Sequence, residues 1–351
     1  MSRLARLARR VGRKLKALAP TPRPPEPPSL PLVLDGRVPL AGYPTVRDVW
    51  CAPAFGVVVD RQGHVLGGAA DEALRVSPDL AALPGVRVHQ GQSRLILPDA
   101  ALRLPKAAVI AGWGGLRNYA GFLLDTLPAF LAADQAGVLA GHPPVLPPLT
   151  PWQAELLTLT GIAAPQTLDA PWTELDEAVL TPALGPVVAH PMLAEVRGRV
   201  LTGLGGANGA GRKLYISRSD LYDAVMVDEA GVEIELAALG YTIVRPETSS
   251  ARELIQLFAE ADLIVAATGT ALANLLFCPP GAEVVEMRPP GSTSVWVQNL
   301  ATGLGLKWRG FDAEGVREML ETPLDAALRP ASAFAWRADV VALLAFLAQR
   351  A

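Results

Sequence analysis

The sequence predicts an α/β fold made of two Rossmann-like domains with a cleft between them. Three observations support this prediction. At 351 residues the chain is too long for one ordinary hydrophobic core, so two domains are expected. Half of the residues are apolar and 19% are charged, which is typical of a globular protein. In the C-terminal part, strand and helix patterns alternate, as in a parallel sheet that is covered by helices.

Residues 1–32 differ in composition from the rest of the chain and are expected to lie outside both domains. Residues 1–18 place leucine and valine at helical spacing among Arg and Lys, which predicts a basic amphipathic helix. Such a helix can bind an anionic membrane surface, and the alternative is a solvated, frayed tail. Residues 19–32 are rich in proline and predict a stiff, extended linker.

The charge of the chain is unevenly distributed. Of 31 Lys and Arg residues, eight lie in residues 1–25, which contain no acidic residue. The rest of the chain therefore has 23 basic and 34 acidic residues. An acidic body argues against nucleic acid as a partner.

Residues 33–202 are predicted to form the first domain. Short strands and turns are expected from Val33 to about Leu104, followed by a buried strand at Ala107–Ala111. A glycine-rich loop then leads into a helix over Tyr119–Ala133, which Pro128 should kink.

Asp125 is the only acidic residue in the first part of that helix, among leucine and phenylalanine. A buried carboxylate is costly unless it is paired or takes part in function. A helical Asp can also face solvent, and the spacing alone leaves both interpretations open.

Residues 203–351 are predicted to form the second domain. The glycine-rich run at 203–211 is interpreted as the connection between the domains. Ser250 and Glu253 have the spacing of a capping box at the start of a helix. Strands are expected at 213–217, 241–244, 262–267 and 283–287, with helices at 228–239, 251–261, before 277 and at 338–347.

Candidate ligand-binding residues follow the strands of this second domain. Thr268, Gly269 and Thr270 form a turn between a strand and a helix, where free backbone N–H groups suit a phosphate or diphosphate. Arg218 follows the first strand, and its guanidinium could form a bidentate pair with a phosphate.

Two carboxylates lie near the ends of other strands in the same domain. Glu247 and Glu286 could accept hydrogen bonds from ribose or sugar hydroxyls. An isolated Arg or Glu at a strand end is usually a solvated surface group. Together these residues nevertheless favour a nucleotide site.

Neither a metal cofactor nor a membrane-spanning segment is expected. The four histidines and two cysteines have no metal-ligand spacing. No apolar run reaches the roughly 18 residues that a span requires, and secretory signal features are missing. We therefore expect a cytoplasmic protein.

Five segments in order resemble glycosyltransferase family 61, the DUF563-type proteins of capsular polysaccharide biosynthesis. The resemblance covers about residues 50–310. The segments that carry it are Asn118 to Pro128 (NYAGFLLDTLP), Tyr215 to Arg218 (YISR), Asp228-Glu229, Pro246 to Ala261, and Ala267 to Glu286.

The resemblance implies a GT-B-like fold and an inverting transfer that does not depend on a metal. A nucleotide sugar would act as co-substrate, and the acceptor would be a hydroxyl of a cell-surface or capsular glycan or glycolipid. This setting implies work at the cytoplasmic membrane face. Asn118 and Asn274 join the candidate site residues because they match family motifs.

Two positions depart from the family pattern, because Gly121 and Thr268 stand where the family has histidine. Imidazoles are suited to act as a base or phosphate partner near neutral pH. Their absence leaves Asp125 as the candidate base. The alternative is a catalytically silent member that binds a sugar nucleotide or glycan as a scaffold in polysaccharide assembly.

Overall fold

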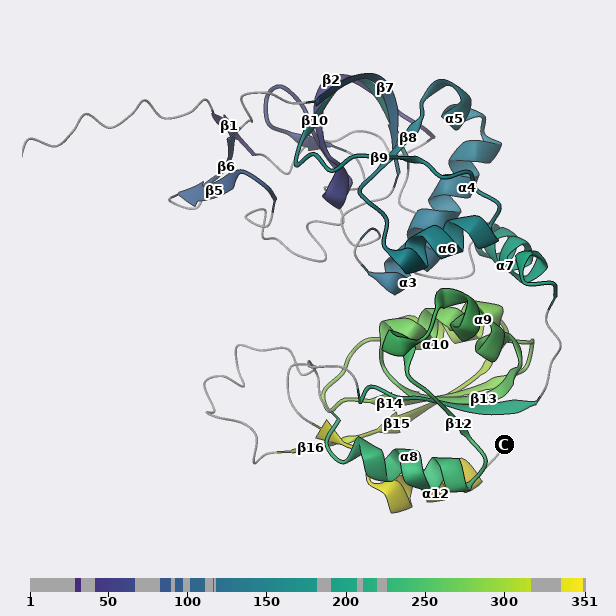
Figure 1. The fold of residues 1–351 in the computed structure, drawn as a ribbon. Helices are drawn as coiled ribbons and strands as arrows, with labels where there is room; N and C mark the ends of the chain where they lie inside the picture. Colours follow the sequence, from purple (N-terminus) through teal and green to yellow (C-terminus); the bar gives the residue numbers. More distant parts are fainter. Residues whose placement is uncertain are drawn as a thin grey trace, which may run out of the picture.

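The computed structural model describes residues 29–32, 42–66, 83–89, 92–96, 102–110, 116, 118–181, 191–206, 211–219, 226–316 and 336–349 (Figure 1). The amphipathic helix predicted for residues 1–18 lies outside this part of the chain. The predicted linker is wrong at its end, because Ser29–Pro31 forms strand β1 and pairs antiparallel with β6 (Gln92–Ile96), which also pairs with β5 (Val86–His89). Of the described helices, none has the length and apolar character needed to cross a membrane.

The first large sheet has seven strands and is mixed, which differs from the Rossmann-like expectation. Strands β10, β7, β8 and β9 run parallel, whereas β2, β3 and β4 pair antiparallel at one edge. The connection between β3 and β4 is too short for a parallel crossover, so it forms a hairpin. The order is β4 (Val65–Leu66), β3 (Val57–Val59), β2 (Thr45–Ala52), β10 (Thr173–Leu180), β7 (Leu102–Val109), β8 (Pro144–Leu146) and β9 (Gln166–Thr167).

The helix expected over Tyr119–Ala133 is present, but Pro128 alters it in an unexpected way. α3 (Tyr119–Gly121) and α4 (Leu127–Gln135) are joined by a π-helical turn, Phe122–Thr126, in which the N–H of Leu127 donates to the carbonyl of Phe122. Proline lacks an N–H and its ring would clash with the carbonyl four residues earlier. The wider turn makes room for that ring, so the irregularity predicted at Pro128 includes a π-turn that the sequence did not indicate.

The second large sheet confirms the predicted parallel α/β arrangement. Its five parallel strands lie in the order β12 (Thr242–Val244), β11 (Arg212–Ile216), β13 (Ala261–Ala267), β14 (Glu283–Arg288) and β15 (Lys307–Asp312). This is the 2-1-3-4-5 order of one class of doubly wound folds.

Helices cover both faces of this sheet (Figure 1). The capping box of Ser250 and Glu253 begins α9 as predicted, and η5 is a 3₁₀-helix. On one face lie α9 (Ala251–Ala259), η5 (Thr270–Phe277) and α10 (Trp296–Gly303), and on the other α8 (Glu229–Ala238) and α12 (Val340–Ala348).

The helices between the two sheets pack into one continuous apolar core. α4, α6 (Pro151–Leu159) and α7 (Pro191–Gly203) from the first half share this core with α9, η5 and α10. Hydrogen bonds between the described helices of the two halves include those from the Tyr119 hydroxyl to Asn274 Oδ1 at 2.7 Å and from Arg197 Nη2 to the Cys278 carbonyl at 3.1 Å. Where these helices meet, the space between the halves is therefore filled.

Candidate functional site

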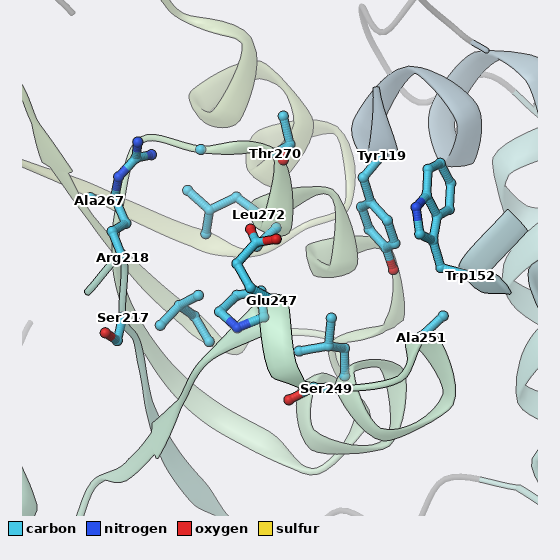
Figure 2. A pocket seen from close by; sticks show the side chains of 15 residues that line it. Tyr119, Trp152, Ser217, Arg218, Glu247, Ser249, Ala251, Ala267, Thr270 and Leu272 are labelled. Carbon is cyan, nitrogen blue, oxygen red and sulfur yellow. The ribbon is translucent and has the colours of Figure 1, made fainter. Parts of the chain in front are cut away.

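A pocket of about 390 Å³ remains open beside this core, at the carboxyl ends of β11 and β13 (Figure 2). These strands are neighbours, and the chain leaves them toward opposite sides of the sheet, so the pocket lies at the topological switch point where doubly wound sheets bind ligands. Its lining comes from both halves: Tyr119 and Trp152 from the first, and Ile216, Ser217, Arg218, Pro246, Glu247, Ser249, Ala251, Leu254, Ala267, Gly269, Thr270, Ala271 and Leu272 from the second.

Arg218 lines the pocket and lies just after β11, at the strand end where the sequence analysis placed it. Its Nη1 donates to the carbonyl of Thr268 at 3.0 Å, so the guanidinium reaches across to the turn after β13. A Cβ at Gly269 would lie only 2.9 Å from this Nη1. The missing side chain at Gly269 therefore lets the guanidinium lie against the turn.

A buried carboxylate holds the backbone of Arg218 in place. Glu229 on α8 is 5% exposed, and its Oε1 accepts hydrogen bonds from the Arg218 N–H at 2.7 Å and from the Tyr215 hydroxyl at 2.8 Å. Burial raises the pKa of Glu229. The sequence motif contained Glu229, but nothing in the motif indicated this role.

One helical turn later, Glu233 joins two loops that border the pocket. Its Oε1 accepts from the hydroxyls of Ser217 at 2.6 Å and Ser219 at 3.2 Å, and its Oε2 accepts from Arg245 Nη2 at 2.5 Å. Arg245 Nε also donates to the Ser219 hydroxyl at 3.1 Å. The loop that carries Arg218 is thus tied to the loop that carries Glu247. The i, i+4 spacing of the two glutamates on α8 was the signal that could have indicated a shared face.

The turn after β13 is held from behind by Glu286. The Thr268 hydroxyl donates to Glu286 Oε1 at 2.7 Å, and the Trp308 indole N–H donates to Oε2 at 3.0 Å. Glu286 is 1% exposed, and neither Glu286 nor Thr268 belongs to the described residues that line the pocket. Gly269 and Thr270 do line it. Glu286 therefore supports the turn and does not face the cavity.

Three other predicted site residues also lie outside the pocket lining. Asn274 is fully buried and accepts from the Tyr119 hydroxyl. Asn118 caps its helix by accepting from the N–H of Gly121 at 3.1 Å. Asp125 is 5% exposed within the π-turn, so the interpretation as a solvent-facing residue is wrong. It nevertheless does not reach the described pocket surface.

Glu247 is the one predicted carboxylate that lines the pocket. It lies on η4 (Pro246–Thr248) and is exposed, and Figure 2 shows its side chain between Arg218 and Tyr119. Among the described lining residues, Glu247 is the only acid and Arg218 the only base. The sequence did not point to Tyr119 or Trp152, because their approach to the second half depends on tertiary packing.

The pocket thus offers a cation beside the backbone of Gly269 and Thr270, a carboxylate, and an aromatic wall. The N–H of Thr268 is not part of this cradle, because it donates to the Met287 carbonyl at 3.0 Å. The cation and the N–H groups of Gly269 and Thr270 suit an anion, and the carboxylate suits a hydroxyl. Within the described part of the chain, no group of three His, Cys, Asp or Glu side chains could hold a metal ion.

A comparison with known protein families gives a match over the segment that contains the pocket residues. A family model described as glycosyltransferase 61 matches residues 119–285, which include every described residue of the lining. Among curated proteins, none matches the chain. Residues 119–285 are therefore similar to glycosyltransferase family 61, the family that the sequence motifs resemble.

Proposed function

We propose that this chain is an inverting glycosyltransferase that moves a sugar from a nucleotide sugar to a hydroxyl of a glycan or glycolipid acceptor. The observation that carries the proposal is the contact of Arg218 with the turn at 268–270, at the switch point of a doubly wound sheet. This contact lies inside the segment that matches a glycosyltransferase family.

In the proposed reaction, the leaving diphosphate binds between the Arg218 guanidinium and the N–H groups at the start of η5. Both are fixed in a partly buried pocket, where they favour the negative charge that develops on the leaving group. Because Arg218 supplies positive charge here, we expect the transfer to proceed without a metal ion. EDTA should leave the rate unchanged, and a loss of activity that Mg²⁺ or Mn²⁺ restores would contradict this part.

A general base is needed to accept the proton of the attacking hydroxyl, and a carboxylate can supply it. The sequence pointed to Asp125, but Glu247 lines the pocket and Asp125 does not. We assign the proton to Glu247 as the acceptor oxygen bonds to the anomeric carbon and the sugar–phosphate bond breaks. Glu247→Gln should then abolish turnover and retain donor binding, whereas Asp125→Asn should retain both. Loss of donor binding in Glu247→Gln would instead indicate a contact with the ribose or the donor sugar.

The proposal extends to the setting of the enzyme. We propose a GT-B-like pair of domains, residues 33–202 on the acceptor side and 203–351 on the donor side, acting in capsular or cell-surface glycan synthesis. Residues 1–18 would hold the protein at the cytoplasmic membrane face, near a lipid-linked acceptor.

One observation favours a second candidate, a silent member that binds a donor or glycan without turnover. Thr268 replaces the family histidine, and its hydroxyl faces Glu286 rather than the pocket. The test is a panel of sugar nucleotides, in which hydrolysis, transfer and binding are measured on the same purified protein. Turnover of any donor supports the transferase, and binding without turnover for every donor and acceptor supports the silent member.

A further inference from the structure

We infer that Tyr119 and Trp152 form a stacking platform for a ring of the ligand, at the end of the pocket opposite Arg218. The inference rests on the proposed function for the identity of that ligand, a nucleotide sugar with its acceptor. It adds the orientation of the ligand in the pocket, with the diphosphate at Arg218 and a ring at Tyr119 and Trp152.

The two rings are held in place from behind. Their centroids lie 5.3 Å apart at an interplanar angle of 55°, and Phe122 packs edge-on against Trp152 at 5.4 Å and 88°. The Tyr119 hydroxyl donates to the fully buried Asn274, and burial raises the pKa of Tyr119, so the hydroxyl stays protonated. Rings that are already ordered lose little entropy when a ligand binds.

The charged residue and the two aromatic residues of the lining lie apart. Figure 2 shows Arg218 on one side of the pocket and the two aromatic side chains on the other. Four apolar residues of the lining come from α9 and η5: Ala251, Leu254, Ala271 and Leu272. An elongated ligand with a charged group at one end and a ring at the other fits this division.

Two rings of the proposed substrates have the required chemistry. A nucleobase stacks on aromatic side chains through its π-face, and a sugar ring presents an apolar C–H face. The shared requirement is a flat or apolar ring face, and experiment can separate the two sources.

The first experiment measures binding of pyrophosphate and of nucleoside diphosphates by calorimetry, for wild type and Trp152→Leu. If the ring is the nucleobase, the substitution should weaken the nucleoside diphosphate about tenfold and pyrophosphate less than twofold. Arg218→Ala should weaken both ligands. The ratio of the two affinities therefore isolates the contribution of the ring.

The second experiment measures binding of simple glycosides with the nucleoside diphosphate at saturation. If the ring belongs to the acceptor, Trp152→Leu should weaken the glycosides about tenfold and leave the nucleoside diphosphate unchanged. Unchanged affinity for both ligand types would overturn the platform. If wild type binds neither pyrophosphate nor any nucleotide, the proposed function fails, and the glycosides alone then decide the inference.

Matched variants separate stacking from general damage to the fold. Trp296 is also partly buried in the core but lies outside the described pocket lining, so Trp296→Leu should leave all affinities within about twofold. Tyr119→Phe keeps the ring and loses only the bond to Asn274, so it should retain the affinity ratio. Trp152→Phe keeps a smaller ring and should give an intermediate affinity, which tests the platform even if Trp152→Leu fails to fold.

Discussion

The two walls of the pocket are held in place by different forces. On the side of the second half, Arg218 in the wall and Thr268 and Arg245 behind it are each fixed by hydrogen bonds to a protein acceptor. On the wall from the first half, Tyr119 and Trp152 are fixed mainly by packing against other rings and the apolar core. Hydrogen bonds depend on single atoms, whereas packing depends on volume. The polar wall should therefore respond to isosteric changes that the aromatic wall tolerates.

The largest effect is expected at the cation of the polar wall. Arg218→Ala should lower the affinity for a nucleoside diphosphate about 100-fold, because a charge-assisted pair with phosphate is lost. Arg218→Lys keeps the charge but not the planar fork, and should fall between wild type and Ala. Calorimetry measures both, and an unchanged affinity in Arg218→Ala would remove this residue from the site.

A smaller effect is expected behind the polar wall. Glu233→Gln replaces a carboxylate that Arg245 and two serines share, so both pocket loops should loosen and affinity should fall about tenfold. Amide exchange of residues 217–219 and 245–249 should speed up in parallel. Glu235→Gln, an exposed change on the same helix, is the control. Equal exchange and affinity in both variants would show that Glu233 does not couple the loops.

Close approach at the turn predicts a further, weaker effect. In Gly269→Ala the new methyl group would lie 2.9 Å from Arg218 Nη1, so the guanidinium must shift. The end of a flexible side chain can move, so we expect a loss of affinity of about fivefold with little change in stability. Gly231→Ala meets no atom within 4 Å and should leave affinity unchanged. If the two variants bind equally, the contact does not matter for binding.

A carboxylate on the first sheet should affect the stability of the protein but not the affinity of the pocket. Hydrogen bonds from Lys106 and His142 lower the pKa of Glu177 from 4.5 to about 2. A lowered folded-state pKa adds stability above the unfolded value of about 4.5, and this stability is lost as the pH falls toward 2. Denaturant unfolding should show Glu177→Gln less stable than wild type at pH 7, with a difference that shrinks below pH 4.5. A constant difference across this range would contradict the linkage, and nucleotide affinity at pH 7 should not change.

Local sequence signals predicted the second half of the molecule well. Alternating strands and helices indicated the parallel sheet, and Ser250 with Glu253 marked the start of α9. Residues just beyond strand ends, Arg218 and Glu247, were placed at the pocket because strand ends of a parallel sheet share one edge.

Side-chain direction and long-range packing could not be predicted in the same way. β14 is buried on both faces, so its pattern did not show that Glu286 points away from the pocket. Trp152 meets Tyr119 only after two helices pack together. The mixed order of the first sheet likewise depends on which distant strands pair.

The π-turn at Phe122–Thr126 means that the aromatic wall depends on the number of residues as well as on their identity. Successive residues of an α-helix are rotated by about 100° around its axis. Deleting one residue from this turn would remove the extra residue of the π-turn and rotate Tyr119 by about that angle relative to α4. The sequence would still contain Tyr119 and Trp152, but Tyr119 would no longer point into the pocket. A related sequence with a one-residue deletion in this turn could therefore keep both aromatic residues and still lack the aromatic wall.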